Sequence, residues 1–392
     1  MTRELLLDLS RLIWRARLAT PSGIDRVERA YARHFLAQDR RKVRFVARMG
    51  PLGARELPRE ALEIFLGSLE RQWHDPGAES DPAAPARLIA ASLRFRRKGP
   101  SIGLIPSHQN WHRRDWLTRL KGKDGRLVLF LHDTIPADYP EYARKGGAER
   151  HRQRLAHALG VADGFVVNSA ATGEALAHYC PRRRLPVPLC VAPIGLDPLD
   201  IAPASDAPLP SRPWFLCLGT IEPRKNHLLL LHVWRRLAEA MPGKAPALVV
   251  VGRRGWENEN IVDLLERGRG LAGLVYEHNA LGDAQLAALL KGAQALLMPS
   301  FAEGFGMPVS EALAAGVPVI AADLAVYRES AGEVPLYLDP LDGPAWHQAV
   351  LDYAEPGSAR RQAQLERLQG WKAPSWEDHF ARVEDLLERL DR

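Results

Sequence analysis

Two glutamates separated by seven residues, with glycines between them, make residues 300–312 the segment best suited to bind a polar ligand. The segment follows an apolar, strand-like run, and Pro308 is suited to the first turn of a helix. Glu303 therefore precedes the predicted helix, and Glu311 falls in its first turn, where the helix dipole favours a carboxylate. Carboxylates that flank the free N–H groups of a helix start could bind vicinal hydroxyls and phosphate oxygens. The alternative is an ordinary strand–loop–helix connection whose glutamate only stabilises the helix.

Two adjacent cations, Arg224 and Lys225, form a second candidate site within residues 219–226. This segment connects a predicted strand to a predicted helix, so the cations lie near a helix N-terminus, where the dipole disfavours positive charge. Cations kept at such a position can bind a diphosphate and stabilise negative charge that develops on it. The sequence shows no metal-ligand cluster, so we expect these two residues to supply the charge without a metal ion. The alternative is a solvated pair of basic side chains.

The first half of the chain offers weaker candidates at the ends of two predicted strands. His132 and Asp133 follow the apolar run 127–131, and a His-Asp pair at the carboxyl end of a strand could take part in an active site. From spacing alone, an aspartate that caps a helix beside a hydrogen-bonded histidine is the better alternative. Gly23 and Arg26 follow the first predicted strand. This glycine permits close approach to a ligand, but a simple turn explains a single glycine almost as well.

Strand-like apolar runs alternate with helical patterns along the chain, which is typical of parallel α/β structure. The proline-rich stretch 196–213 reads as a linker between an N-terminal domain, 1–195, and a C-terminal domain, 214–375, and residues 376–392 form a last amphipathic helix. The predicted strands are 4–9, 43–48, 127–132, 164–168, 214–219, 247–251, 274–276, 295–298 and 317–321. The predicted helices are 25–38, 226–240, 260–267, 283–290, one starting near 308, and 376–390, and residues 75–86 form a predicted loop.

Length and composition agree with two globular domains. The 392 residues are 46% hydrophobic and 26% charged. No apolar run approaches the ~18 residues of a membrane span, and the N-terminus does not resemble a signal peptide. The three cysteines imply neither a disulfide framework nor a zinc site, so we expect a cytoplasmic protein.

Charge is unevenly distributed between the two halves. Residues 1–195 hold 34 lysines and arginines against 20 aspartates and glutamates, whereas residues 196–392 hold 19 against 27. The basic half could therefore meet an anionic partner such as a membrane surface or a lipid pyrophosphate. An arginine-rich surface in contact with solvent explains the excess equally well.

The string Pro-Ser-Phe-Ala-Glu-Gly-Phe-Gly-Met-Pro-Val-Ser-Glu-Ala, followed by Gly-Val-Pro-Val, resembles the Glu-x7-Glu motif of retaining GT-B glycosyltransferases, in particular glycosyltransferase family 4. The resemblance covers most of residues 212–392 and is patchy over residues 1–195. It implies an α/β GT-B fold with two facing Rossmann-like domains, in which the last helix crosses back onto the first domain.

The same resemblance implies roles for the candidate residues. Glu311 would hold the nucleotide ribose and Glu303 the transferred sugar, while His132 would contact the donor sugar. Arg224 and Lys225 would bind the pyrophosphate, because Thr220 stands where many family members carry an arginine. Further contacts to the nucleotide sugar would come from Gly23, Thr220, Gly252, Arg253, Ala280, Leu281, Gly304, Phe305 and Gly306. The acceptor would meet Asp133 and Arg26, or Arg15 and Arg17.

Together these features predict a retaining, metal-independent glycosyltransferase without a cofactor. The string Glu-Pro-Arg-Lys-Asn at 222–226 resembles mannosyl- and rhamnosyltransferases of bacterial surface polysaccharides, which indicates a GDP-linked mannose or deoxy relative as donor. We expect a lipid-linked or oligosaccharide acceptor, peripheral contact with the anionic inner membrane, and no nucleic-acid partner. Two alternatives stay open: another GT-B enzyme, such as a nucleotide-sugar epimerase or a phosphorylase, and a non-catalytic protein that binds a nucleotide sugar or an anionic surface.

Overall fold

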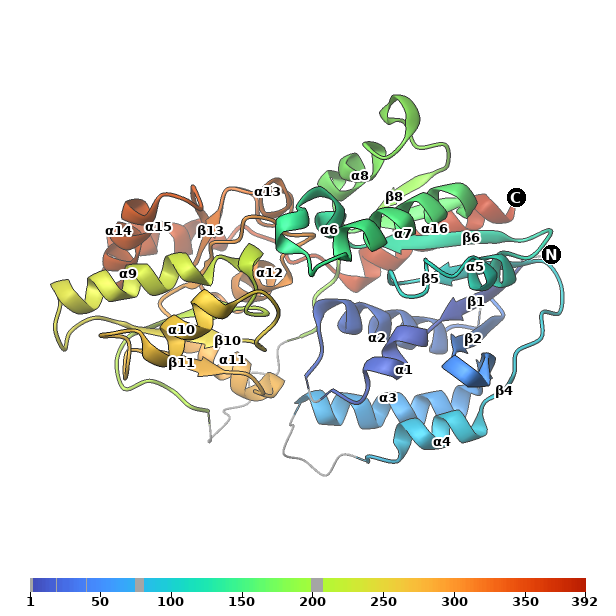
Figure 1. Cartoon of the computed structure of the whole chain (residues 1–392), viewed down its shortest axis with the longest axis horizontal. Helices are drawn as coiled ribbons and strands as arrows, with labels where there is room; N and C mark the ends of the chain where they lie inside the picture. Colours follow the sequence, from blue (N-terminus) through green and yellow to red (C-terminus); the bar gives the residue numbers. More distant parts are fainter. Residues whose placement is uncertain (1–2, 19, 40, 75–80, 199–206) are drawn as a thin grey trace. The chain divides into compact units, whose positions relative to one another are not determined.

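The computed structural model describes residues 3–18, 20–39, 41–74, 81–198 and 207–392. The chain divides into two compact units: Met1–Gly195 with Ser375–Arg392, and Leu196–Pro374. Each unit is an α/β structure built on its own mostly parallel sheet, as the sequence predicts (Figure 1). Most of the predicted loop and of the proline-rich stretch, residues 75–80 and 199–206, lie outside the described residues.

The first unit contains one sheet, to which the described residues contribute eight strands. Across the sheet these are β4 (Leu93–Arg94), β3 (Ala54–Leu57), β2 (Val43–Arg48), β1 (Glu4–Asp8), β5 (Ser101–Ile105), β6 (Arg126–Leu131), β7 (Gly164–Val167) and β8 (Leu189–Val191). Only β3 and β4 pair in the antiparallel sense. The strand order reverses between β1 and β5, and such a reversal opens a crevice at the carboxyl ends of the two strands.

The helices of the first unit cover this sheet. They are α1 (Ser10–Arg15), α2 (Gly23–Leu36), α3 (Arg59–His74), α4 (Ala84–Ala91), α5 (Arg114–Lys121), α6 (Ile135–Asp138), α7 (Gly147–Val161), α8 (Ala170–Ala177) and α16 (Trp376–Asp391). The α2 helix begins two residues before the predicted start, because Ser22 and Asp25 form a reciprocal capping box. The predicted loop 75–86 extends too far toward the C-terminus, because α4 begins at Ala84, with Pro85 in its first turn.

The last helix, α16, packs against β7 and β8 of the first unit, although nearly the whole second unit separates it from them in the sequence (Figure 1). Its His379 is completely buried, and the Tyr31 hydroxyl lies 2.9 Å from the Nε2 of this histidine. The ring of Phe380 stacks on His34 of α2 at a centroid distance of 3.7 Å. The terminal helix therefore completes the core of the first unit.

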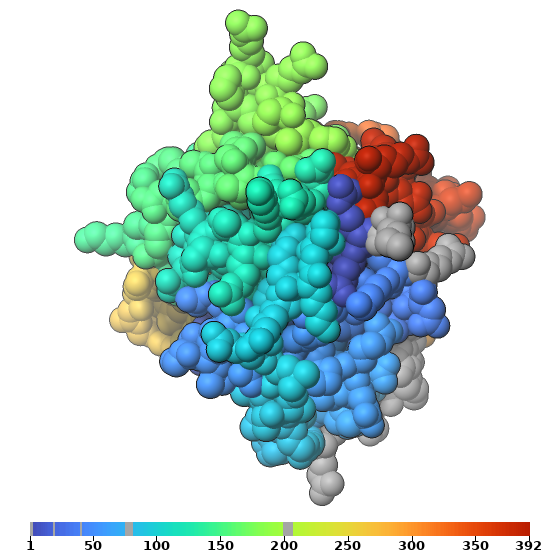
Figure 2. Space-filling model, turned by 90° about the vertical axis from the view of Figure 1, so that its right-hand side faces the viewer, coloured from blue at the N-terminus to red at the C-terminus, as the bar shows by residue number. Residues whose placement is uncertain are grey.

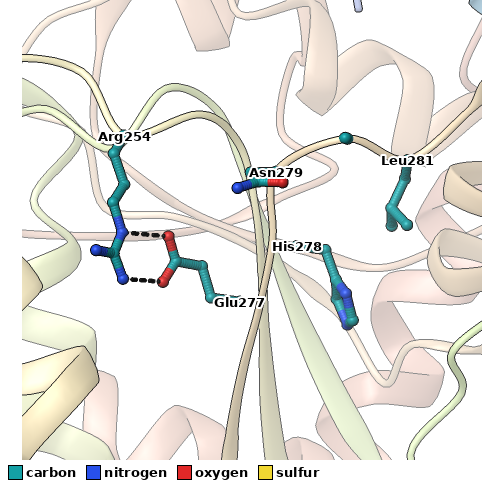
Figure 3. Close-up of a pocket in the computed structure, with 6 residues that line it drawn as sticks. Arg254, Glu277, His278, Asn279 and Leu281 are labelled. Carbon is teal, nitrogen blue, oxygen red and sulfur yellow. Dashed lines mark hydrogen bonds and ion pairs between the residues drawn. The ribbon is translucent and has the colours of Figure 1, made fainter.

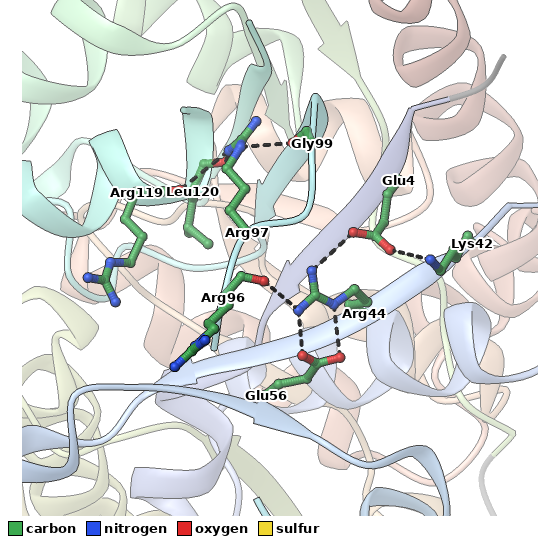
Figure 4. A network of polar contacts seen from close by, with 9 residues as sticks. All are labelled: Glu4, Lys42, Arg44, Glu56, Arg96, Arg97, Gly99, Arg119 and Leu120. Atoms are coloured by element: carbon green, nitrogen blue, oxygen red, sulfur yellow. Dashed lines mark hydrogen bonds and ion pairs between the residues drawn. The ribbon is translucent and has the colours of Figure 1, made fainter. Parts of the chain in front are cut away.

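A buried arginine ties the first strands of this sheet together (Figure 4). Arg44 of β2 forms ion pairs with Glu4 of β1, at 3.1 Å, and with Glu56 of β3. It also donates a hydrogen bond of 2.9 Å to the carbonyl of Arg96. A buried cation is costly unless it is paired and fully hydrogen-bonded, and these partners meet that condition.

The second unit has a parallel sheet, to which the described residues contribute six strands. Across the sheet these are β11 (Val275–His278), β10 (Ala247–Val251), β9 (Trp214–Leu218), β12 (Leu296–Met298), β13 (Val319–Ala322) and β14 (Leu336–Leu338). The accompanying helices are α9 (His227–Ala240), α10 (Glu259–Arg267), α11 (Asp283–Gly292), α12 (Met307–Ala314), α13 (Ala325–Ala331), α14 (Gly343–Ala354) and α15 (Ala359–Leu368). This is the Rossmann strand order, and its reversal lies between β9 and β12. Among the described residues, no helix is both long and apolar enough to cross a membrane.

Candidate functional site

The loops that follow β9 and β12 lie side by side at the reversal of strand order in the second unit. The backbone N–H of Phe301 donates to the carbonyl of Arg224 at 2.8 Å, and the Arg224 guanidinium donates to the carbonyl of Ala302 at 2.8 Å. The side-chain amide of Asn226 donates to the carbonyl of Pro299 at 3.2 Å. The two segments that the sequence singles out, 219–226 and 300–312, thus meet at the place where α/β sheets of this type bind ligands.

Glu303 is the centre of a buried ion-pair cluster in these loops. Its carboxylate pairs with Arg224 at 2.9 Å and with Lys225, and the Ser300 hydroxyl donates to it at 2.8 Å. Only 6% of the Glu303 side chain and 9% of the Lys225 side chain are exposed. Burial opposes ionisation of Glu303, but the two cations outweigh it and lower the pKa of this carboxyl to about 2. Glu303 is therefore a permanently charged hydrogen-bond acceptor at neutral pH.

The sequence did not identify Glu222 as part of the cluster. Its carboxylate lies 2.6 Å from the Nε of Arg224, and its side chain is 2% exposed. Burial raises the pKa of Glu222, against the lowering effect of Arg224 and Lys225. Two cations and two carboxylates thus share this small volume, which leaves Arg224, 20% exposed, as the most accessible of these four side chains.

Local backbone geometry fixes Lys225 in this position. Residues Pro223–Lys225 form one 3-10 turn, and Asn226 follows with a φ of 56° as the residue before α9. Asparagine is one of the few side chains that tolerate such a left-handed conformation. Gly219 precedes the turn, and a Cβ there would lie 3.1 Å from the Cε of Lys225, so a larger residue would press on the lysine.

The entry to α12 is shaped by Gly306 and by the buried ring of Tyr327. Gly306 has a φ of +83°, and a Cβ at this position would overlap the Tyr327 ring. Burial raises the pKa of the Tyr327 hydroxyl well above its usual range, and the nearby Glu303 carboxylate raises it further. Tyr327 belongs to α13, outside any motif, so no sequence signal connects it with the site.

One sequence prediction for α12 is wrong. The helix begins at Met307, so Glu311 is its fifth residue and its first turn contains no acidic residue. Pro308 does lie at the start of the helix. Glu311 is half-buried on the second turn, and Gly304 and Phe305 lie in the loop between the two glutamates. A direct effect of the helix dipole on Glu311 is correspondingly smaller.

The loop after β10 lies against the loop after β9. Ile221 donates its N–H to the carbonyl of Arg253 at 2.9 Å, and Gly255 donates to the carbonyl of Ile221 at 2.9 Å. The N–H of Gly252 donates to the carbonyl of His278 at 2.8 Å, so the end of β11 also lies against the loop after β10. A Cβ on Gly252 would collide with the backbone of Gly219, so close packing requires glycine there. The structure thus places the loops that contain Thr220, Gly252 and Arg253 together.

A pocket of about 440 Å³ opens at the ends of β10 and β11 (Figure 3). It is lined by Arg254, Glu277, His278, Asn279, Ala280 and Leu281. Two parallel contacts of 2.8 Å join the Arg254 guanidinium to the Glu277 carboxylate, and Glu266 pairs with the remaining guanidinium nitrogen. The sequence predicts Ala280 and Leu281 at a nucleotide site, but not the pair of side chains beside them.

His132, in the first unit, lies at the end of β6 with one ring nitrogen engaged. Its Nε2 donates to the carbonyl of Pro106 at 2.8 Å, and the ring stacks on Phe130. Burial lowers the pKa of His132 to about 4, so the ring is neutral near pH 7. The proton on Nε2 makes Nδ1 an acceptor, and no described residue donates to it.

The other candidates of the first unit lie at the starts of α6 and α2. The Asp133 carboxylate accepts the N–H of Ile135 at 3.2 Å at the start of α6, although the N-cap of that helix is Thr134. Gly23 is the exposed first residue of α2, and Arg26 is half-buried one turn later. Asp25 interacts electrostatically with His132, so the start of α2 and the end of β6 are neighbours.

Comparison with known proteins agrees with this arrangement. The family model described as Glycosyl transferases group 1 matches residues 204–334, which include Arg224, Lys225, Glu303 and Glu311. The chain is a glycosyltransferase with a group 1 domain. The enzyme is 29% identical over 349 residues to O-antigen chain mannosyltransferase B of Escherichia coli, covering 83% of this chain and 89% of that protein. It is also 28% identical over 229 residues to the serotype-specific mannosyltransferase WbdA of Escherichia coli, covering 54% of this chain but only 28% of WbdA.

Structural comparison confirms the predicted GT-B fold of the enzyme. Sucrose-phosphate synthase from Thermosynechococcus elongatus superimposes with a TM-score of 0.65 at 20% identity, and the match covers 99% of each chain. In the part of the enzyme that the structure describes, no three His, Cys, Asp or Glu side chains are placed to hold a metal ion.

Proposed function

We propose that the enzyme transfers mannose, or a deoxy relative, from a GDP-sugar to a lipid-linked glycan of a bacterial surface polysaccharide, with retention of anomeric configuration. The observation that carries this proposal is the buried cluster of Arg224, Lys225 and Glu303 at the strand reversal of the group 1 domain. The likeness to O-antigen chain mannosyltransferase B supports the choice of sugar and of pathway.

The cluster provides both kinds of group that a sugar diphosphate needs. Arg224 and Lys225 would bind the diphosphate and stabilise the charge that grows as the bond to the sugar breaks, in surroundings of low dielectric constant. Since two fixed cations can supply this stabilisation, no metal ion is required. Glu303 would accept hydrogen bonds from sugar hydroxyls, helped by the N–H groups of Gly304, Phe305 and Gly306.

The remaining parts of the donor would lie along the same edge of the sheet. Glu311 would hold the ribose hydroxyls, and the base would enter the pocket at Arg254 and Glu277 (Figure 3). The Glu277 carboxylate suits guanine, which presents two adjacent N–H donors, N1 and N2, whereas uracil presents one donor between two carbonyls. The guanidinium of Arg254, held flat by two carboxylates, offers a face on which a purine can stack.

Transfer with retention requires only these groups and the substrates. The bond between the anomeric carbon and the diphosphate oxygen breaks, and the acceptor oxygen bonds to the same face of the sugar. The proton of the acceptor hydroxyl passes to the leaving diphosphate, so no side chain serves as general base. Neutral His132 would accept a hydrogen bond from the donor sugar at Nδ1 and orient it.

The basic first unit would bring the enzyme to the membrane that carries its acceptor. Exposed cations gather in the segment 94–126, which contributes to the face shown in Figure 2. These are Arg94, Arg96, Lys98, Arg113, Arg114, Arg119 and Lys123. Leu93, at the edge of the sheet, is 63% exposed beside them. Each such cation contributes about 1 kcal/mol of attraction to an anionic leaflet. Equal binding to vesicles with and without anionic lipid would contradict this peripheral contact.

Thermal shift tests the donor. We expect GDP-mannose to raise the melting temperature more than UDP, ADP or dTDP sugars, with and without EDTA, because a ligand of the folded state stabilises it in proportion to ln(1 + [L]/Kd). Glu311→Ala should abolish the shift, while Glu259→Ala, an exposed glutamate at the start of α10, should keep it. A larger shift with a UDP-sugar would overturn the choice of guanine. A shift that disappears with EDTA would overturn metal independence.

A further inference from the structure

A second group of basic residues lies at the strand reversal of the first unit, apart from the exposed cations described above. It is formed by Arg11 of α1, Arg48 at the end of β2, Arg154 of α7, and His108 and His112 in the loop after β5; we call it the arginine–histidine cluster. β2, β1 and β5 are neighbours in the sheet, so these residues converge at the carboxyl ends of adjacent strands. That edge is where α/β sheets bind their ligands.

Ring contacts bring the members together: the His108 ring lies 5.0 Å from the Trp111 ring and 5.3 Å from the ring of His151, which belongs to α7 like Arg154. Burial lowers the pKa of His108 most, followed by its neighbours His151 and His132 and then by Arg154. For His112, Arg154 is the largest cause after burial. Arg11 lowers the pKa of His108 and Arg48 that of His112. Burial and the like charges of Arg150 and Arg11 lower the pKa of Arg154 itself. Such mutual repulsion is costly unless an anion compensates it.

The described residues do not supply that anion to Arg48 or Arg154. Both side chains are half-buried, and neither forms an ion pair or side-chain hydrogen bond with a described residue. The Nε of Arg154 and the indole N–H of Trp111, a fully buried residue of the loop after β5, are buried donors without a partner among these residues. Buried donors are usually satisfied in folded proteins, so an unpaired one calls for an explanation such as a bound ion or water.

The acidic groups nearby are occupied or uncharged. Asp25 pairs with Arg11 at 3.2 Å and with Arg15, the last residue of α1, at 3.3 Å, so its carboxylate already has two cationic partners. The buried Asp8 carboxylate accepts from Ser10 and from the Trp116 indole. Burial raises the pKa of Glu28 to about 8, so it is largely protonated at pH 7. The cluster therefore keeps a net positive charge.

We propose that the arginine–histidine cluster binds a phosphate or diphosphate group of the acceptor, with Arg154 and Arg48 as its principal ligands and the Trp111 N–H as a further donor. This inference rests on the proposed transfer to a glycan acceptor, and it names the chemistry by which the first unit recognises that acceptor. Each arginine can donate two parallel hydrogen bonds to phosphate oxygens, and such bidentate contacts provide both affinity and a defined orientation. The phosphate belongs either to a sugar phosphate or to a lipid diphosphate, and both carry the same group.

Calorimetry with inorganic pyrophosphate tests the site. The nucleotide site of the second unit is first saturated with the nucleoside diphosphate that gives the largest thermal shift, whichever base it carries. We expect the wild type to bind one further pyrophosphate, and Arg154→Gln and Arg48→Gln each to weaken it at least fivefold. Arg154→Lys should restore part of the affinity, because it keeps the charge. Arg71→Gln, at an exposed arginine in the last turn of α3, is the matched control and should bind as wild type.

The outcome separates this proposal from the proposed transfer. Absence of the second pyrophosphate, or equal binding by Arg154→Gln and Arg71→Gln, would overturn the site, while nucleotide binding would still report on the donor. Competition then identifies the source: displacement by a hexose 6-phosphate indicates a sugar phosphate, and displacement by a soluble short-chain prenyl diphosphate indicates a lipid acceptor. Displacement by neither would overturn the assignment to the acceptor.

Discussion

Lys225 and Glu303 form an ion pair in which both side chains are at least nine-tenths buried, although 77 residues lie between them in the sequence. The pair joins the loop after β9 to the loop after β12, and so bridges the strand reversal of the group 1 domain. A diphosphate that binds the Lys225 ammonium group would therefore bind beside the Glu303 carboxylate, which already pairs with that group. The contact that, in the proposed function, prepares the site for a sugar diphosphate would thus also stabilise the fold around it.

A double-mutant cycle tests this dual role. Lys225→Met leaves Glu303 with Arg224 as its only cation, and Glu303→Gln leaves a buried lysine without its carboxylate. We expect each change to lower the free energy of unfolding of the second unit by about 3–5 kcal/mol, because one partner stays buried and charged. The double variant should lose less than the sum, by about 0.5–3 kcal/mol, in urea unfolding followed by circular dichroism. Strictly additive losses would show that the pair is not coupled.

Gly306 should be irreplaceable for two separate reasons. Its φ of +83° disfavours any side chain, and a Cβ would overlap the Tyr327 ring. Gly316 is the matched control, since it has a φ of +76° but no atom within 4 Å of its Cβ position. We expect Gly316→Ala to cost about 1–2 kcal/mol from backbone conformation alone. Gly306→Ala should lower the melting temperature further and abolish donor binding. Equal melting temperatures for Gly306→Ala and Gly316→Ala would show that the Tyr327 ring can move aside without loss of stability.

Periodicity in the sequence predicts strands in both units, although it misses β14 of the second unit. The predicted strands 43–48 and 247–251 coincide with β2 and β10, because their apolar residues are buried on both faces of a parallel sheet. The short β5, Ser-Ile-Gly-Leu-Ile, was missed: it follows a basic stretch and contains a glycine, whose Cβ would lie only 3.0 Å from Leu120. The need for a small residue in this strand arises from its packing against Leu120, and the local sequence carries no pattern that reveals such packing.

The candidate site was predictable where one segment contains the functional groups together. Glu303, Glu311, Arg224 and Lys225 lie in two short strings with helix-start features, and the structure brings these strings into contact. Tyr327 and the Arg254–Glu277 pair come from separate elements, and only the folded sheet brings them to the same edge. The arginine–histidine cluster is likewise assembled from four elements far apart in the sequence: α1, β2, the loop after β5, and α7. From the sequence, the predicted acceptor residues were instead Arg26, or Arg15 and Arg17 on the loop after the first strand.

Glu28 should make the stability of the first unit depend on pH. Its side chain is fully buried in α2, and burial raises its pKa from 4.5 to about 8. Between these values the unfolded chain releases the proton while the folded chain keeps it, so the folded state binds more protons and stability falls as pH rises. We expect the melting temperature of the wild type to decrease from pH 5 to pH 8.

Glu28→Gln removes this titration and keeps the shape of the side chain. The variant should match the wild type near pH 5 and melt at a higher temperature at pH 8. Glu63→Gln, an exposed glutamate on α3, is the control and should follow the wild-type curve. Asp8, whose pKa burial raises to about 6, contributes over a lower range and equally in all three proteins. Parallel curves for Glu28→Gln and wild type would rule out a protonated Glu28.

The buried contact between Tyr31 and His379 should anchor the terminal helix. The Nδ1 of His379 lies 2.9 Å from the carbonyl of Pro193, so it carries the proton, and Nε2 accepts from the Tyr31 hydroxyl at 2.9 Å. Burial lowers the pKa of His379 to about 4, which keeps this arrangement at neutral pH. His379→Leu leaves the hydroxyl and the carbonyl without partners, at a cost of about 1–3 kcal/mol for each buried group.

Hydrogen exchange can localise that loss. We expect amides of residues 376–391 to exchange faster in His379→Leu, whereas those of the second unit keep wild-type rates, because α16 packs on the first unit. Tyr31→Phe should show a smaller effect in the same residues, since it removes the hydroxyl and leaves only Nε2 without a partner. Adding Tyr31→Phe to His379→Leu should recover part of the stability, because the buried hydroxyl is then gone as well. If exchange in 376–391 stayed at the wild-type rate, apolar packing of Phe380 and Val383 would suffice to hold the helix.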